Sequence, residues 1–237
     1  KELNQSMKTN NVTLLHGVTG SGKTEIYVQI IQDYIDQCHQ VLFLLPEIAL
    51  TTQLIQRLSV YFGEKIGVYH SKFNQNERVE IWNKVLANDP NEFRIILGAR
   101  SSVFLPYQAL GLIIVDEEHE GSFKQYDPSP RYNARDASIV LAQMHQAKVI
   151  LGTATPSMES YYNAKQKKFG IVELNERYKG LKLPEVLFSD VKRERRLKNM
   201  NSHFSKFLLE EMDQVLKKGE QVILFQNRRG YTPLWSC

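Results

Sequence analysis

Apolar runs alternate with amphipathic stretches along the first two thirds of the chain. Runs with an apolar centre, each typical of a buried strand, occupy residues 12–17, 41–46, 65–70, 93–98, 110–118 and 147–155. Apolar positions at helical spacing predict helices at 23–37, at 75–88 and at 134–146, and Leu50, Leu54 and Leu58 predict another helix around them. Strands buried on both faces that alternate with helices predict an α/β fold with a parallel sheet between two helical layers.

The pattern changes after residue 170. Residues 171–191 are more extended and interrupted by proline, and the basic run KRERRLK follows at 192–198. A helix is predicted at 205–218 and a strand at 221–231. We therefore expect a first domain at 1–170 and the beginning of a second α/β domain at 171–237. The basic run is interpreted as a solvated connector.

Composition narrows the class of protein only slightly. The chain has 237 residues and a formal net charge of +4, which is compatible with an anionic partner but weak evidence for one. No apolar run approaches the roughly 18 residues of a membrane span, and the polar N-terminus is unlike a signal peptide. Two cysteines, Cys38 and Cys237, cannot form a disulfide framework, so a reducing cytoplasm is the expected compartment.

The stretch GVTGSGKT, Gly17 to Thr24, matches the phosphate-binding pattern G-x-x-x-x-G-K-[ST]. Glycines let successive backbone N–H groups turn toward phosphate oxygens, and the following helix adds its positive end. Lys23 would reach the β- and γ-phosphates of ATP, and the Thr24 hydroxyl would bind Mg²⁺. The alternative is a plain glycine turn, but a strand before it and a helix after it favour a nucleotide site. The expected nucleotide-binding residues are Gly17, Val18, Thr19, Gly20, Ser21, Gly22, Lys23, Thr24 and Glu25.

A second acidic motif, DEEHE, follows the apolar run at 110–115. Asp116 would hold Mg²⁺, and Glu117 would orient or deprotonate an attacking water. Alone, this motif could be an acidic loop at the end of a strand. Together with the phosphate loop, it predicts hydrolysis of a nucleoside triphosphate, with Lys23, Asp116 and Glu117 as catalytic residues.

Seven segments, taken in order, carry a family resemblance. They are GVTGSGKTEIY, LPEIALTTQ, HSKFNQNER, GARSSVF, DEEHEGSFKQYDPSPRYNARD, GTATPSMES and FQNRRGYTPLWSC. From about residue 12 to residue 237 the chain resembles the bacterial replication-restart helicases, the PriA family of superfamily 2. The resemblance implies a 3′→5′ DNA helicase core with one complete RecA-like lobe and an incomplete second lobe. It further implies ATP and Mg²⁺ as cofactors, with single-stranded DNA, forked DNA and primosome proteins as partners, and no membrane.

The resemblance also bears on zinc. Cys237 resembles the first ligand of a zinc-binding insertion in the second lobe. One cysteine cannot complete a tetrahedral zinc site, so Zn²⁺ is expected only in a full-length protein, and an unliganded thiol is favoured here.

Polar residues that follow predicted strands are candidates for DNA contacts. Thr51, Ser71, Arg100 and Ser101 stand at such positions, where hydroxyls and guanidinium groups suit phosphate oxygens. The alternatives are a helix cap at Thr51 and a solvated arginine at Arg100. The family resemblance favours DNA for all of them.

The segment 122–136, SFKQYDPSPRYNARD, combines rings with basic groups beside the acidic motif. Phe123, Tyr126 and Tyr132 could stack on bases without reading sequence. Lys124, Arg131 and Arg135 could meet phosphates. The alternative is that the rings fill a minor core. We interpret the segment as a loop that couples DNA binding to hydrolysis.

Further residues are candidates for coupling between nucleotide and DNA. His119 could connect the nucleotide site to Thr153 and Thr155 of GTATPS, or be a structural histidine. The two threonines could instead cap a strand end. Arg228 and Arg229 could face DNA or the interface between lobes.

The same motifs leave three alternatives to a helicase. They are a translocase that does not separate strands, a nucleotide-binding interaction module and, more remotely, a small-molecule phosphotransferase. Stimulation of ATPase activity by single-stranded DNA distinguishes the first from the last two. For residues 1–237 alone we expect nucleotide binding at best and no unwinding.

Overall fold

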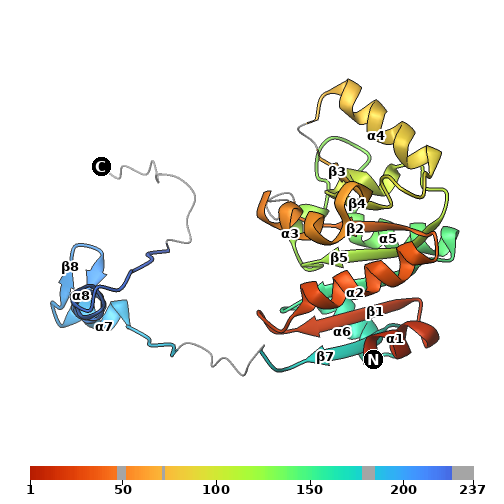
Figure 1. Ribbon diagram of the computed structural model, residues 1–237. Helices are drawn as coiled ribbons and strands as arrows, with labels where there is room; N and C mark the ends of the chain where they lie inside the picture. The colour runs from red at the N-terminus through yellow and green to blue at the C-terminus, as the bar shows by residue number, and fades with distance from the viewer. Residues whose placement is uncertain (47–51, 71–72, 178–184, 226–237) are drawn as a thin grey trace. The chain divides into compact units, whose positions relative to one another are not determined.

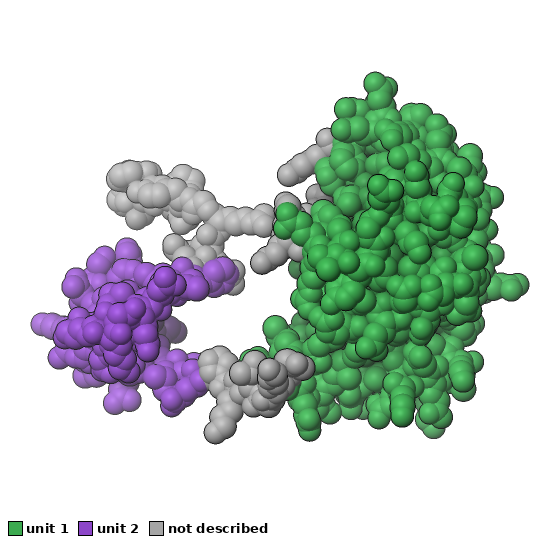
Figure 2. Space-filling model, in the orientation of Figure 1, with its two compact units in different colours: residues 1–182 green, residues 183–237 purple. Residues whose placement is uncertain are grey.

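The computed structural model describes residues 1–46, 52–70, 73–177 and 185–225. The chain divides into two compact units, Lys1–Lys182 and Leu183–Cys237 (Figure 2). The boundary expected after residue 170 falls too early. The reason is that the strand Gly170–Leu174 pairs along Val12–Gly17 and therefore belongs to the sheet of the first unit.

The first unit is built on a seven-stranded sheet in which every pairing between strands is parallel (Figure 1). The strand order is β3-β4-β2-β5-β6-β1-β7. The strands are β1 (Val12–Gly17), β2 (Gln40–Leu44), β3 (Ile66–Tyr69), β4 (Ile95–Gly98), β5 (Leu110–Asp116), β6 (Lys148–Thr153) and β7 (Gly170–Leu174). The α/β fold with a parallel sheet, predicted from the apolar runs, is confirmed.

Helices connect these strands. They are α1 (Glu2–Thr9), α2 (Lys23–Asp36), α3 (Thr52–Phe62), α4 (Gln75–Ala87), α5 (Ala134–His145) and α6 (Met158–Lys165), with short 3₁₀ turns η2 (Gly63–Lys65), η3 (Arg100–Phe104) and η4 (Gly121–Phe123). Of these, α4, α5 and α6 begin at a side chain that caps the helix. At α4, the Asn74 side chain accepts from the backbone of Glu77 while the Glu77 side chain accepts from the backbone of Asn74. Asn133 and Ser157 cap α5 and α6. The sequence pattern did not predict α1 or α6, because both are short and mostly polar.

Apolar side chains fill the space on both faces of the sheet. On one face, α1, α2 and α3 contribute Met7, Ile31 and Leu58 to a cluster with strand residues. On the other face, α4 and α5 contribute Val85 and Ala142. The sheet is therefore a buried layer, which explains why its strands are apolar at consecutive positions.

A consequence of the all-parallel arrangement is that the strands' carboxyl ends share one edge. β6 lies between β5 and β1. In register, Asp116 of β5 pairs with Gly152 of β6, and Thr153 of β6 pairs with His16 of β1. The loops after β1, β5 and β6, which carry the three strongest sequence motifs, are consequently neighbours.

The second unit is smaller, and its described residues form helices and one short pair of strands. It contains α7 (Val191–Arg196), a two-stranded antiparallel pair of β8 (Met200–Asn201) with β9 (Phe204–Ser205), and α8 (Lys206–Lys217). Ser205 caps α8, so the predicted helix at 205–218 is confirmed. The strand predicted at 221–231 is wrong over 221–225, where no strand is assigned and no described strand lies alongside to pair with it; the rest falls outside the described residues.

The basic run at 192–198 lies largely on α7, which has no buried residue. This agrees with its interpretation as a solvated segment. In the described parts of the chain, no helix is long and apolar enough to cross a membrane.

Candidate nucleotide site and its neighbouring surface

The phosphate loop joins the end of β1 to the start of α2. Gly20 and Gly22 have φ angles of 80° and 85°, a region that side chains disfavour, so glycine is required for this turn. Lys23 opens α2, and its Nζ donates to the carbonyl oxygen of Gly17 at 2.8 Å. The Ser21 hydroxyl oxygen is shielded from solvent and has no hydrogen-bond partner among the described residues. The loop thus presents an ammonium group, a helix N-terminus and an unused hydroxyl within one turn, a donor set suited to phosphate.

A pocket of about 640 Å³ lies over this loop. It brings together the two motifs that the sequence places about 90 residues apart. It is lined by Thr19, Gly20, Ser21, Gly22, Lys23, Thr24, Glu25, Arg57, Asp116 and Glu117. The predicted convergence of phosphate loop and acidic motif is therefore present in the fold. Gly17 and Val18 lead into the loop: Gly17 ends β1, and Val18 N donates to Leu174 O at 3.1 Å.

Asp116 ends β5, lines the pocket and is partly buried. Burial raises the pKa of its carboxyl group, and the neighbouring Glu117 adds to the effect. The hydrogen bond from the Tyr27 hydroxyl, 2.9 Å to Oδ1, and the charge of Lys23 act in the opposite direction without cancelling it. A carboxylate that is poorly compensated by its protein neighbours is a favourable ligand for a divalent cation.

Gly152 makes the contact between Tyr27 and Asp116 possible. A Cβ atom at Gly152 would lie 1.7 Å from the Tyr27 hydroxyl oxygen and 3.2 Å from Asp116 Oδ1. Because Tyr27 is fully buried, its ring has no room to move away. The glycine of GTATPS therefore serves the nucleotide site directly.

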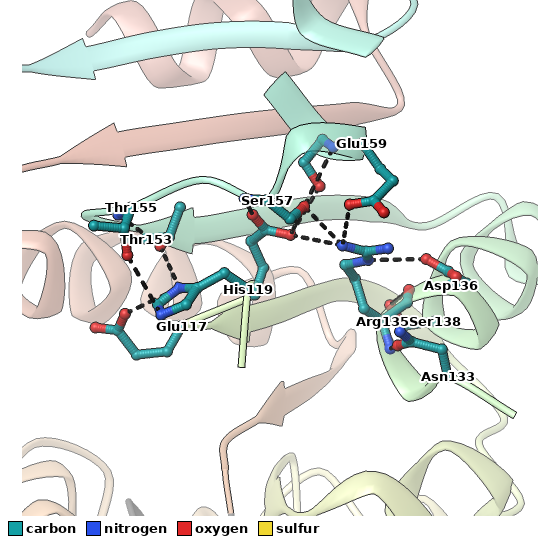
Figure 3. A network of polar contacts seen from close by, with 12 residues as sticks. Glu117, His119, Asn133, Arg135, Asp136, Ser138, Thr153, Thr155, Ser157 and Glu159 are labelled. Atoms are coloured by element: carbon teal, nitrogen blue, oxygen red, sulfur yellow. Dashed lines mark hydrogen bonds and ion pairs between the residues drawn. The ribbon is translucent and has the colours of Figure 1, made fainter. Parts of the chain in front are cut away.

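Glu117 has a φ angle of 50°, in the left-handed region that non-glycine residues rarely adopt. This turn sends His119 toward β6 and the segment after it, as Figure 3 shows. His119 Nδ1 lies 2.8 Å from Thr153 Oγ1 and 3.7 Å from Glu117 Oε2, and Nε2 lies 3.4 Å from Thr155 Oγ1. His119, Thr153 and Thr155, the three residues predicted to couple the nucleotide site to GTATPS, are in contact with one another.

The residues fit a magnesium–nucleotide complex. Thr24 and Asp116 both line the pocket and would hold Mg²⁺ together with phosphate oxygens, and Lys23 and Ser21 would hold the phosphates. Among the described residues, no group of three or more His, Cys, Asp or Glu side chains forms a metal cage.

Comparison with known protein families places the chain. The sequence profile of the DEAD/DEAH box helicases matches residues 2–164, which include the phosphate loop, the acidic motif and all of β6. The chain belongs to the DEAD/DEAH box helicases. A domain of this family implies ATP and Mg²⁺ at the pocket described above, in agreement with the sequence prediction.

Within the DEAD/DEAH box helicases, the chain is similar to curated proteins named replication restart protein PriA, so the resemblance drawn from the seven motifs is confirmed. It is 42% identical to the protein of Bacillus subtilis over 96% of this chain, 44% to that of Rickettsia prowazekii over 97%, and 44% to that of Haemophilus influenzae over 96%. The chain spans 28%, 35% and 30% of these relatives' lengths, respectively.

Solved helicase structures share the fold. RecG, in a structure bound to a three-way DNA junction, aligns with a TM-score of 0.58 at 19% identity, covering 89% of this chain and 25% of RecG. The Hef helicase domain of Pyrococcus furiosus aligns with a TM-score of 0.52 at 16% identity, covering 92% of this chain and 47% of that chain. These two structures confirm the RecA-like α/β fold.

Several of the residues predicted to contact DNA lie at the surface. Tyr126 is 65% exposed, and Lys124 Nζ lies 5.2 Å from the centre of its ring. Arg131 is exposed in the same loop. Arg100 and Ser101 are half-buried at the start of η3, and Arg100 Nη1 donates to the carbonyl oxygen of Ser122 at 3.3 Å. The loop after the acidic motif and the segment GARSSVF of this helicase domain therefore adjoin each other.

Two of the predicted DNA contacts are wrong. Phe123 is 1% exposed and packs in the core, because η4 turns its ring inward. Arg135 is also buried, where it pairs with Glu118. Tyr132 is intermediate: it packs against the core and meets Phe104 edge-on, with ring centres 4.9 Å apart. For Phe123 the alternative of a filled core is correct.

The remaining candidates lie outside the described residues of this DEAD/DEAH box chain. They are Thr51, Ser71, Arg228, Arg229 and Cys237. Cys38, the other cysteine, is free and exposed.

Sequence reasoning missed four residues at or beside the site. Tyr27 lies within the predicted helix at 23–37, and its place one turn after Lys23 points it toward the same strand ends. Arg57 comes from α3 and pairs with Glu25 at the pocket's edge. Glu118 and Ser157 stand inside the two quoted helicase motifs, but no local pattern shows that their side chains meet.

Proposed function

We propose that this chain is the ATP-binding core of a DNA helicase that acts in replication restart, with 3′→5′ polarity. The observation that carries the proposal is the pocket in which Lys23 and Thr24 face Asp116 and Glu117. Its support from relatives is the similarity to PriA proteins over nearly all of this chain.

The wider activity is proposed for the longer protein. The chain spans about a third of the curated relatives it matches, so partners and zinc concern a larger molecule. We propose that the whole protein acts on single-stranded and forked DNA with primosome proteins in the cytoplasm. The unit from residue 183 is proposed to begin the second RecA-like lobe, and Cys237 to contribute to a zinc site completed elsewhere in the protein.

The proposed chemistry follows from the geometry of the side chains. Lys23 and the loop amides would bind the phosphates, and Asp116 with Thr24 would hold Mg²⁺, which when bound would supply positive charge at the transferring phosphoryl group. Glu117 accepts a proton from the attacking water. His119 contacts Glu117, Thr153 and Thr155, and is proposed to relay the state of the site to the segment after β6.

The proposed DNA surface is the loop after the acidic motif with η3. Lys124, Arg131 and Arg100 supply positive charge for the phosphate backbone, and Tyr126 supplies an exposed ring for stacking. Ser101 adds a hydroxyl beside Arg100. Thr51, Ser71, Arg228 and Arg229 remain proposals from the sequence.

The proposal is tested by the variant Lys23→Ala in the full-length protein. Loss of the ammonium group should lower DNA-stimulated ATP hydrolysis by about a hundredfold or more, since it removes charge stabilisation of the phosphates. Lys168→Ala, an exposed lysine of the same unit, is the matched control and should retain the rate. Undiminished hydrolysis by Lys23→Ala would refute the assignment.

A translocase that moves without separating strands is the second candidate, because the same lobe serves both activities. A forked substrate with a fluorescent strand distinguishes them in the full-length protein. Strand release that requires ATP supports the helicase; stimulated hydrolysis without release supports the translocase.

A further inference from the structure

The side chain of Glu118, the third residue of the acidic motif, is completely buried. It accepts four hydrogen bonds: from Ser157 N at 2.7 Å, Ser157 Oγ at 2.9 Å, Ser160 Oγ at 2.8 Å and Arg135 Nη1 at 3.1 Å. Figure 3 shows this group beside the cluster around His119. His119 therefore contacts the two threonines of GTATPS. The adjacent Glu118 contacts Ser157 and Ser160 at the start of α6.

The ion pair between Glu118 and Arg135 closes the base of the loop proposed to meet DNA. Glu118 immediately precedes residues 119–134 and Arg135 immediately follows them. Inside the loop, Lys124 and Asn133 form an antiparallel bridge, and Gln125 N donates to Tyr132 O at 2.8 Å. The two sides of the loop are therefore tied to each other above the ion pair at its base.

Glu118 is equally tied to the nucleotide pocket. Its neighbour Glu117 lines the pocket and holds the left-handed conformation. Glu118 N donates to the carbonyl oxygen of Gly152 at 3.1 Å, so its main chain and its carboxylate are both fixed. The orientation of Glu117 depends on this anchorage, since a left-handed non-glycine residue persists only where its surroundings hold it.

Arg135 has partners on three elements. Its Nη1 donates to Ser157 Oγ at 2.8 Å as well as to Glu118, and its Nε donates to Asp136 at 2.9 Å. Burial lowers the pKa of the guanidinium group, but the bonds and charges of Asp136 and Glu118 outweigh burial and raise it. Buried ion pairs contribute little to stability compared with apolar packing, because desolvation offsets the attraction. A pair this fully bonded is better explained by the geometry it enforces.

We propose that Glu118 and Arg135 are positioning residues that couple the loop at 119–134 to Glu117. The inference rests on the proposed function, because it assigns the path by which DNA on the loop accelerates hydrolysis. Binding of DNA to Lys124, Tyr126 and Arg131 would shift the base of the loop. We call the contacts of Glu118 with Arg135 and Ser157 the clasp. Through the clasp, this shift would change the orientation of Glu117.

The test uses full-length Glu118→Gln and Arg135→Lys with a single-stranded oligonucleotide. Glu118→Gln keeps the shape and an acceptor but removes the charge; Arg135→Lys keeps the charge but loses the forked bonding. We expect the ratio of DNA-stimulated to basal kcat to fall about tenfold in each, with the KM for ATP within about twofold, because the pocket side chains are intact.

Matched variants separate coupling from packing. Glu80→Gln removes the exposed ion pair between Glu80 and Lys84 and should leave stimulation unchanged. Ser160→Ala removes a single hydrogen bond to Glu118, and a loss of about twofold is expected. In the double variant of Glu118→Gln with Arg135→Lys, the loss should be clearly smaller than the product of the single losses, since both break one clasp.

The outcomes are distinguishable from failure of the proposed function. If DNA does not stimulate the unaltered protein, the proposed function fails first. If the unaltered protein is stimulated and both clasp variants, folded by circular dichroism, are stimulated equally well, the clasp is overturned. Should Glu118→Gln not fold, Arg135→Lys and Ser160→Ala decide: normal stimulation in both overturns the proposal, and reduced stimulation in both supports it.

Discussion

Asp116 is a residue of the nucleotide site whose charge lowers the stability of the folded state. Burial and Glu117 raise the pKa of its carboxyl group, and Tyr27 and Lys23 compensate only in part. A carboxyl group with a raised pKa in the folded state binds protons more readily than in the unfolded chain. Its contribution to folding is therefore lost as pH rises above its usual value of 3.8 and through the raised value.

We predict that Asp116→Asn makes the unliganded protein more stable at neutral pH while abolishing hydrolysis. Relief of the buried charge should increase the free energy of unfolding by about 0.5–2 kcal/mol, the range typical of substitutions that remove functional strain. The gain should shrink as pH falls toward the usual range of the carboxyl group. Chemical denaturation at a series of pH values measures it, and equal or lower stability at neutral pH would contradict the prediction.

Gly152 provides a second prediction at this scale. In Gly152→Ala, the new Cβ atom collides with the Tyr27 hydroxyl, and the bond to Asp116 must break. Overpacking of this kind costs about 1–3 kcal/mol. Thermal unfolding measures the loss, and the double variant with Tyr27→Phe, which removes the hydroxyl, should recover part of it. No recovery in the double variant would show that the clash lies elsewhere.

At the scale of the element, the loop after the acidic motif divides into buried and exposed parts. Phe123 belongs to the core, whereas Tyr126 points to solvent with Lys124 beside it. Composition alone could not separate these two rings, since both occur in the same polar, proline-containing segment. The turn η4 decides which ring is buried, and no local pattern specifies it.

The two rings should therefore respond in opposite ways to substitution by alanine. Phe123→Ala leaves a cavity and should cost about 3–5 kcal/mol of stability. Tyr126→Ala should change stability by no more than about 0.5 kcal/mol. It should raise the DNA concentration for half-maximal ATPase stimulation by about tenfold, because a stacking partner is lost. Denaturation and ATPase titration measure the two effects; a stimulation curve unchanged in Tyr126→Ala would remove this ring from the DNA surface.

Elements with a strong local signal were predictable from the sequence. The apolar runs ending at Gly17 and Asp116 are β1 and β5, and the caps of α4 and α8 agree with the predicted helix starts. Contacts between side chains that are far apart in the sequence could not be predicted. Examples are the buried pair of Glu118 with Arg135 and the approach of Tyr27 to Asp116 over Gly152.

At the scale of the whole molecule, all residues that line the nucleotide pocket belong to the unit Lys1–Lys182. All strands of the seven-stranded sheet belong to it as well. We predict that a chain ending at residue 182 binds a fluorescent ATP analogue with an affinity within about twofold of that of residues 1–237, because no pocket contact is removed. A much weaker affinity would show that the second unit contributes to the site.

The order of strands in the sheet has a consequence for synthesis. Among the seven strands of this sheet, β1 is synthesised first, but its neighbours β6 and β7 are synthesised last, and β7 ends at Leu174. At translation rates of about 5–20 residues per second, β1 waits roughly 8–30 s for its partners. During that interval the backbone of β1 has no neighbouring strand to pair with. A chaperone that binds nascent chains would therefore find an unpaired apolar segment at β1, directly before the phosphate loop.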